Sequence, residues 1–169
     1  GTDTRWHSVE RALAQGHSIE DVAAASSIDP WFLDQIAEMV DEAEGLRGET
    51  LADISRDDLR ASKRLGLSDD YIGHLTGTDE QAVRRHRAAL DLRPVFKTVD
   101  TCAGEFPADT PYHYSSYEDD TEVRPSERER VVIIGAGPNR IGQGIEFDYA
   151  CVHAAFALRA AGYEAVMVN

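Results

Sequence analysis

A glycine-rich stretch, GAGPNRIGQGIEFDY at residues 135–149, contains the residue types most suited to chemistry in this sequence. It follows the apolar run at 131–134 and precedes apolar residues at helical spacing, which predicts the order strand, glycine loop, helix. In that order, backbone N–H groups at the start of the helix can bind the phosphates of a nucleotide. The first hypothesis is therefore a nucleotide-binding loop.

The spacing of the glycines argues against a dinucleotide site. The G-x-G-x-x-G fingerprint requires glycine at position 140, where this sequence has Arg140. The second strand should end in an acidic residue that binds a ribose hydroxyl, but it ends in Asn169. Glu146 and Asp148 stand at the start of the helix, where a pyrophosphate would otherwise bind and where the helix dipole stabilises them. An NAD-dependent oxidoreductase is therefore the weaker alternative.

A second candidate site is a helix-turn-helix pattern at residues 68–90, with Gly77 in its turn. Basic side chains surround its second helix, namely Arg84, Arg85, Arg87 and Arg93. However, the chain has 17 Lys and Arg residues against 31 Asp and Glu residues, a net charge of −14, and the corresponding stretch at 29–44 is strongly acidic. Because nucleic acid is bound through basic side chains that release counterions, we expect no nucleic-acid partner. An acidic stand-alone module that binds DNA or a regulatory protein is the alternative function.

Other catalytic or metal chemistry has no support in the sequence. The six histidines lack the spacing of metal ligands, and no Ser–His–Asp or Cys–His set can be assigned, so we predict neither a metal nor a catalytic residue. Cys102 and Cys151 lie far apart and are interpreted as free thiols, which favours a reducing, cytoplasmic location. No apolar run approaches the ~20 residues needed to cross a bilayer, and the N-terminus has no signal-peptide core.

Residues 1–93 are predicted to form a mainly α domain of short helices. Serine, threonine or aspartate caps precede the helical patterns, and glycines follow them. Helices are expected to begin after Ser18, Asp29, Ser55, Ser68 and Thr78, where Thr78 forms a capping box with Gln81, and to stop near Gly16, Gly45 and Gly66.

The helical region contains an internal repeat, because residues 18–40 align without a gap with residues 68–90. Each copy has a cap, a short helix, a turn, a second cap and a longer helix, so we expect two helical hairpins that pack together. Their shared core is predicted to contain Val22, Phe32, Leu33, Ile36, Ile72, Leu75, Val83 and Leu90. Apolar residues at 31–40 exceed one buried stripe, and Trp31 is the candidate contact with a second copy of the chain.

The pattern changes after Arg93. Residues 94–129 contain prolines and repeated tyrosines without a helical period, which predicts an ordered but irregular connecting segment. Residues 130–169 predict one βαβ unit, with strands at 130–134 and 165–168 and a helix from about 147 to 161. Two parallel strands and one helix do not make a stable domain, so we expect a truncated, Rossmann-like α/β unit of a larger domain.

The segment VVIIGAGPNRIGQGIEFDYACVHAAFALRAAGYEAVMVN resembles the start of the C-terminal synthetase half in the family of carbamoyl-phosphate synthase large chains. Upstream, IDPWFLDQI, KRLGLSDDYI, RPVFKTVDTCAGEF and YHYSSYE resemble the helical oligomerisation domain of that family and the segment that leaves it. The resemblance covers essentially the whole chain. It implies a pre-ATP-grasp fold for residues 130–169, which is similar to a Rossmann unit but lacks its dinucleotide.

The resemblance also implies a function. Members of the family make carbamoyl phosphate from bicarbonate, glutamine-derived ammonia and two ATP, with Mg²⁺ or Mn²⁺, for arginine and pyrimidine biosynthesis. They work with a glutaminase small chain and self-associate through the helical domain. Residues matching Arg140, Gly144 and Glu146 line an internal tunnel that carries carbamate between two synthetase halves. No ATP site falls within this chain, so we expect it to bind no cofactor and to be inactive by itself.

Overall fold

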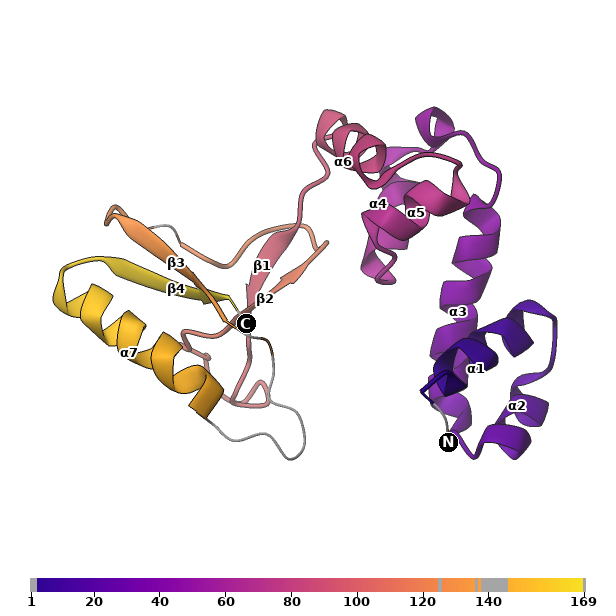
Figure 1. The fold of residues 1–169 in the computed structure, drawn as a ribbon, viewed down its shortest axis with the longest axis horizontal. Helices are drawn as coiled ribbons and strands as arrows, with labels where there is room; N and C mark the ends of the chain where they lie inside the picture. Colours follow the sequence, from indigo (N-terminus) through magenta and orange to yellow (C-terminus); the bar gives the residue numbers. More distant parts are fainter. Residues whose placement is uncertain (1–2, 125, 136, 138–145, 169) are drawn as a thin grey trace. The chain divides into compact units, whose positions relative to one another are not determined.

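The computed structural model describes residues 3–124, 126–135, 137 and 146–168, with only the backbone described at 146–148. The chain divides into two compact units, residues 1–123 and residues 124–169 (Figure 1). The first unit contains the helical region and a two-stranded antiparallel sheet. Its elements are α1 (Arg5–Ala14), α2 (Ile19–Ser26), α3 (Pro30–Leu46), the 3₁₀ turn η1 (Leu51–Asp53), α4 (Arg56–Arg64), α5 (Asp69–Leu75), α6 (Glu80–Ala89), β1 (Val95–Thr98) and β2 (His113–Ser116).

Local capping signals set the starts of helices α2 to α6. The Ser18, Ser55 and Ser68 hydroxyls each accept a hydrogen bond from the backbone N–H three residues further on, as the sequence predicts. Pro30 occupies the first turn of α3, where its missing N–H costs no helical bond. The predicted cap at Thr78 is wrong by one residue, because the Asp79 carboxylate accepts from the Ala82 N–H and begins α6.

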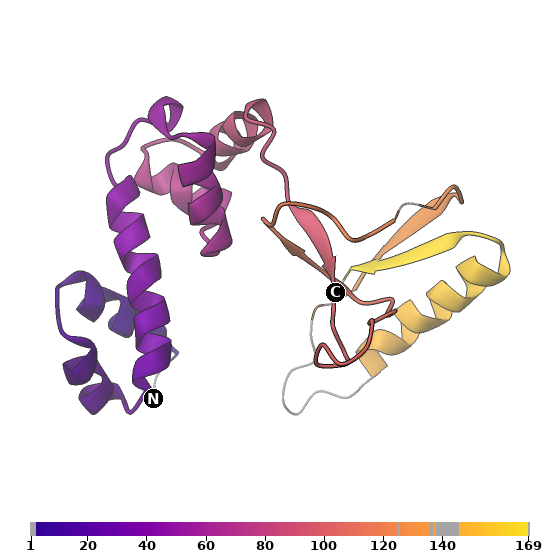
Figure 2. The same ribbon diagram turned by 180° about the vertical axis from the view of Figure 1, so that it is seen from behind.

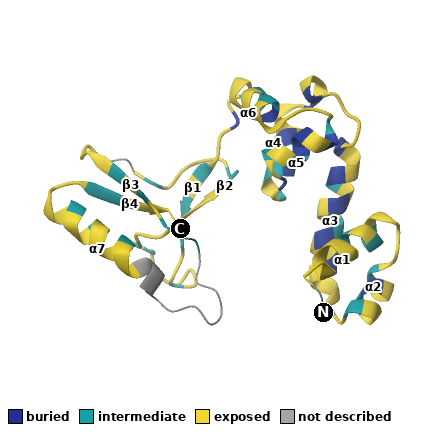
Figure 3. Cartoon of the chain, in the orientation of Figure 1, coloured by how far each residue is buried: buried dark blue, intermediate teal, exposed yellow. Residues whose placement is uncertain are grey.

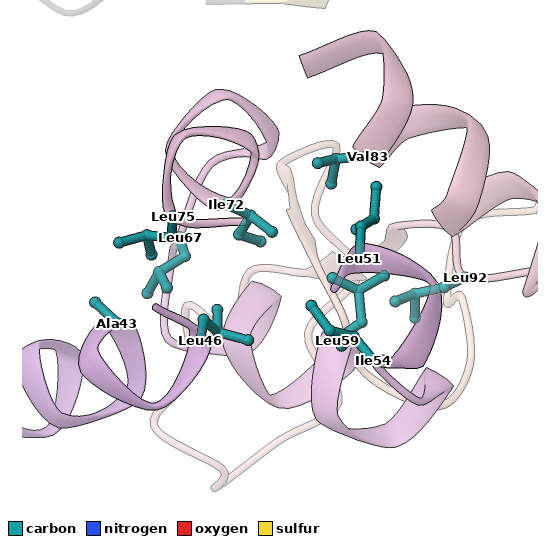
Figure 4. Close-up of a cluster of buried hydrophobic side chains, with 10 residues drawn as sticks. All are labelled: Ala43, Leu46, Leu51, Ile54, Leu59, Leu67, Ile72, Leu75, Val83 and Leu92. Atoms are coloured by element: carbon teal, nitrogen blue, oxygen red, sulfur yellow. The ribbon is translucent and has the colours of Figure 1, made fainter. Parts of the chain in front are cut away.

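Figure 3 marks the buried residues of the helical region in dark blue. Their side chains form two clusters rather than one. The α1–α3 cluster consists of Val9, Val22, Leu33, Ile36 and Val40. The α4–α6 cluster consists of Ala43, Leu46, Leu51, Ile54, Leu59, Leu67, Ile72, Leu75, Val83 and Leu92 (Figure 4). Helix α3 contributes to both clusters and therefore links them.

The prediction that the two hairpins share one core is wrong, because their buried residues belong to different clusters. Val22, Leu33 and Ile36 belong to the first cluster, whereas Ile72, Leu75 and Val83 belong to the second. Phe32 is 55% exposed, and Leu90 is only partly buried against the second cluster. The reason is the length of α3: with 17 residues against 10 in α6, its two ends reach different partners, and α1 packs on its first half.

A short sheet occupies the segment that the sequence analysis interprets as irregular. Strands β1 and β2 pair antiparallel in the register Val95↔Ser116 to Thr98↔His113. Residues 121 and 122 then return to β1, since the Glu122 N–H donates to the Phe96 carbonyl at 2.8 Å. Residues 94–129 therefore contain regular structure that the sequence pattern did not predict.

The second unit contains the predicted βαβ arrangement. Strands β3 (Arg130–Ile134) and β4 (Glu164–Val168) are parallel, with Val132 opposite Val166 in the ladder. Helix α7 (Glu146–Ala160) connects them and packs against both strands (Figures 1 and 2). Val131 and Ile133 are half-buried, but Val132 and Ile134 are exposed, so among the described residues α7 covers one face of this sheet and not both.

Candidate functional site

The N-terminal turn of α3 presents two aromatic side chains to solvent. Asp29 accepts a hydrogen bond from the Trp31 N–H at 2.9 Å, which orients the first turn of the helix. Trp31 is 63% exposed and Phe32 55% exposed, and their rings meet edge to face with centroids 5.0 Å apart. The predicted contact residue Trp31 is therefore available to a partner.

The apolar stripe of α3 is wider than its buried part. Leu33, Ile36 and Val40 face the α1–α3 cluster, as their spacing of three and four residues requires. Phe32 and Met39 lie seven residues apart, on one side of this stripe, and Met39 is 38% exposed. The helix thus carries more apolar surface than the rest of the unit covers.

A groove of about 450 Å³ lies beside Met39, between α1, α3 and the turn that joins α4 to α5. It is lined by Trp6, His7, Glu10, Arg11, Ala14, Ile36, Met39, Val40, Ala43, Glu44, Arg47, Gly66, Leu67, Ser68 and Tyr71. Trp6 is 55% exposed. Arg47 hydrogen-bonds both oxygens of Glu44 and holds the pKa of that carboxyl below its usual value. The groove combines apolar and charged side chains, as protein interfaces do.

The described structure does not test the predicted tunnel segment. Arg140 and Gly144 lie outside the described residues, and Glu146 is the first residue of α7 with no described side chain. Gly137, within the same loop, has φ of +91°, a conformation that favours glycine. The tunnel role of Arg140, Gly144 and Glu146 stays a prediction.

A charged network that the sequence analysis missed lies between α4, α5 and α6. Asp69 forms ion pairs with Lys63 at 2.9 Å and with Arg87 at 2.8 Å, and the side chains are 9–12% exposed. Burial alone would raise the pKa of Asp69, but hydrogen bonds from Arg87 and Lys63 outweigh it and the pKa lies below its usual value. The Tyr117 ring packs over both cations, with Lys63 Nζ 5.6 Å and Arg87 Cζ 5.7 Å from its centroid, and burial raises the pKa of its phenol.

The internal repeat contained a signal for this network. Asp69 aligns with Ile19 and Arg87 with Ala37, so the second hairpin has opposite charges where the first has two apolar residues. The network also reduces the number of arginines available to nucleic acid. Arg87 binds Asp69 and the Leu92 carbonyl, and Arg93 lies 3.5 Å from Asp91.

Among the residues that the structure describes, no group of three or more His, Cys, Asp or Glu side chains could hold a metal ion. None of the described helices is long and apolar enough to cross a membrane.

Comparison with known proteins defines the class of this chain. Residues 1–91 match the family model of the carbamoyl-phosphate synthetase large chain, oligomerisation domain. Residues 127–169 match the model of the carbamoyl phosphate synthase preATP-grasp domain. The chain therefore joins an oligomerisation domain to preATP-grasp sequence.

Individual relatives agree with the family models. The chain is 58% identical to the carbamoyl phosphate synthase large chain of Kocuria rhizophila over 168 residues, or 99% of its length. It is 55% identical to that of Clavibacter michiganensis subsp. michiganensis over 99% of its length, and 56% identical to that of Myxococcus xanthus over 95%. The chain belongs to the family of carbamoyl-phosphate synthase large chains. It spans 15% of the length of each of these relatives.

Proposed function

We propose that this chain works as part of a carbamoyl-phosphate synthase large chain. That enzyme would make carbamoyl phosphate from bicarbonate, glutamine-derived ammonia and two ATP, for arginine and pyrimidine biosynthesis in the cytoplasm. The observation that carries the proposal is the match of two consecutive domain models, in one order, to one family of large chains. ATP, Mg²⁺ or Mn²⁺ and a glutaminase small chain would bind elsewhere in the enzyme, so the chain by itself is inactive.

The proposal assigns three segments to three roles. Residues 1–93 serve as the oligomerisation domain, residues 94–129 connect it to the synthetase half, and residues 130–169 form the first βαβ unit of the pre-ATP-grasp domain. The inactivity of the isolated chain can be tested by assaying bicarbonate-dependent ATP hydrolysis. Hydrolysis above background in the purified chain would contradict this assignment.

The helical domain self-associates through the exposed aromatic pair of α3. Trp31 and Phe32 together place a large apolar surface in water, and burying such a surface drives association. Sedimentation over a concentration series should therefore show reversible association of the chain. Trp31→Ala should weaken it by roughly 2 kcal/mol, which is more than tenfold in the dissociation constant.

A matched control distinguishes association through this surface from non-specific association. Phe106 is 70% exposed and lies in the loop between β1 and β2, so Phe106→Ala should leave association unchanged. Equal sedimentation of Trp31→Ala and the parent would remove Trp31 from the interface. A parent chain that stays monomeric at every concentration would contradict self-association itself.

Arg140, Gly144 and Glu146 form part of the carbamate tunnel wall in the intact enzyme. Carbamate decomposes in water, so it must travel along a closed path; Gly144 leaves the path open, Arg140 attracts the anion, and Glu146 keeps Arg140 from trapping it. Gly144→Phe in the intact enzyme should abolish carbamoyl phosphate formation. Glutamine hydrolysis, bicarbonate-dependent ATP hydrolysis, and ATP synthesis from carbamoyl phosphate and ADP should all persist. If these activities fall together, Gly144 has a structural role and the tunnel assignment fails.

A further inference from the structure

The β1–β2 hairpin is joined to the α4–α6 cluster at two places. The first is covalent: Leu92 is 2% exposed within the cluster, and Arg93 and Pro94 lead from it directly into β1. The second is formed by the residues that follow β2. Between the end of β2 at Ser116 and the return to β1 at Thr121, the chain passes over α4.

Each residue from 117 to 119 contacts a cation of α4. Arg60 Nε donates to the Tyr117 carbonyl at 3.0 Å, and Arg60 Nη2 lies 2.6 Å from Asp119 Oδ1. Arg64 Nη2 lies 3.5 Å from Glu118 Oε2, and Lys63 lies over the Tyr117 ring. Arg60, Lys63 and Arg64 are spaced by three and four residues, so they share one face of α4.

These contacts fall into a buried part and an exposed part. Lys63 and Arg87, the two cations beneath the Tyr117 ring, have side chains 9% and 12% exposed and are fixed from below by Asp69. Asp119 is 85% exposed and Glu118 41%, so salt screens their ion pairs. The ion pairs of Glu118 and Asp119 are therefore the salt-sensitive contacts, whereas the Tyr117 ring lies over the buried cations.

Both ends of the segment 117–120 are attached to the β1–β2 hairpin. Ser116 is the last residue of the β2 ladder, and Glu122 lies beside β1, where its carboxylate accepts from the Thr98 N–H at 2.7 Å and pairs with Lys97 at 2.6 Å. A rigid hairpin that is attached at two points keeps one orientation on the helices. The same hairpin attached only through residues 92–94 can swing about the few backbone torsions of that connection.

We propose that residues 117–120 form a reversible strap that holds the β1–β2 hairpin on the α4–α6 cluster. The packing of the Tyr117 ring provides its main attachment, and the ion pairs to α4 add a contribution that salt weakens. Opening the strap leaves Arg93 and Pro94 as the hinge, because Leu92 is held in the cluster. The strap therefore controls how freely the β1–β2 hairpin moves with respect to the α4–α6 cluster. This role concerns conformation and goes beyond self-association and the carbamate tunnel.

Spin labels on the helices and on the hairpin test the strap directly. Cysteines replace Gln81 of α6 and Tyr114 of β2, which are exposed, in a chain where Cys102→Ser and Cys151→Ser remove the native thiols. Dilution with unlabelled protein excludes distances between copies. Double electron–electron resonance should give one narrow distance distribution for this reference chain and for Tyr117→Phe, which keeps the ring. It should give a broad distribution for Tyr117→Ala.

Two further variants keep the test independent of folding. Asp119→Lys changes an 85% exposed side chain and should broaden the distribution by opposing Arg60, to a smaller extent than Tyr117→Ala. Tyr112→Ala removes an aromatic ring that is 64% exposed outside the strap and should leave the distribution narrow. A broad distribution in the reference chain, or a narrow one in Tyr117→Ala, overturns the proposal.

Discussion

The two helical hairpins, α2–α3 and α5–α6, share a local design but differ in what they bury. Their equivalent positions, fifty residues apart, have the same backbone roles. A serine caps the first helix, a residue with φ near +60° ends it, and an aspartate caps the second helix; the pairs are Ser18 and Ser68, Ser27 and Gly77, and Asp29 and Asp79.

The two hairpins differ in the contacts that their side chains make. Ile19 of the first hairpin packs against the apolar α1–α3 cluster, whereas Asp69 at the equivalent position forms the network with Lys63 and Arg87. Trp31 and Phe32 of the first hairpin are exposed, and the equivalent Gln81 and Ala82 belong to a helix that lacks this aromatic pair. Local signals therefore produce the hairpin backbone, and the surrounding elements decide which residue types it needs.

The largest expected effect comes from Ile36→Asp, which should destabilise the first hairpin alone. Ile36 is 5% exposed in the α1–α3 cluster, so Ile36→Asp removes apolar packing and buries a charge without a partner, costing roughly 3–5 kcal/mol. Thermal unfolding measures the loss. Hydrogen exchange should rise in α1 to the first half of α3 while the α4–α6 cluster keeps its protection, because the two clusters are distinct. Phe32→Asp, at a side chain 55% exposed, is the control and should cost far less.

The stability of the second hairpin should fall at acidic pH, unlike that of the first. The pKa of Asp69 is lowered in the folded state, so its contribution is complete above the unfolded value of about 4 and is lost as the pH falls below it. Asp69→Asn leaves Lys63 and Arg87 without their anion and should cost on the order of 3 kcal/mol at neutral pH. Denaturation followed from pH 7 to pH 3 should show a smaller acid loss in Asp69→Asn than in the parent. Asp70→Asn, at the exposed neighbour, should retain the acid loss of the parent.

A close backbone contact distinguishes the turn of the second hairpin. A Cβ atom on Gly73 would lie 2.9 Å from the carbonyl carbon of Asp79 and 3.2 Å from the Thr78 carbonyl oxygen. Gly73→Ala should therefore destabilise the chain by about 1–3 kcal/mol, despite the higher helix propensity of alanine. His74→Ala, at the exposed adjacent position of α5, should be close to neutral. A stabilised Gly73→Ala variant would show that the helices of this hairpin can separate without cost.

The smallest effect concerns the residue that ends the first helix of each hairpin. Ser27 has φ of +57°, whereas the equivalent Gly77 has φ of +68°. Because a left-handed conformation is strained for serine but not for glycine, Ser27→Gly should raise the free energy of unfolding by up to about 1 kcal/mol. Gly77→Ser should lower it by a similar amount. Changes of the same sign in the two variants would mean that neighbouring contacts, rather than φ, decide stability at these turns.

Much of the local structure follows from sequence because its causes are local. A cap such as Ser18 acts on an N–H three residues away, and a glycine such as Gly162 ends α7 through its own φ of +91°. Residues 131–134 and 165–168 are continuous apolar runs joined by one helix, so the parallel pairing of β3 and β4 was also predictable. Membership of the family rested on the motif at 135–149 and on the helical segments upstream, and the family models confirm it.

Tertiary structure alone decided three other features. The division of the core between two clusters depends on the length of α3 and on the packing of α1, which no pattern within either repeat contains. Strands β1 and β2 have four residues each and meet across residues 99–112, so their pairing comes from contacts that are distant in the sequence. The burial of Asp69 beneath Tyr117 joins four segments of the chain. Periodicity reports one face of one element, whereas burial depends on every element that packs against that face.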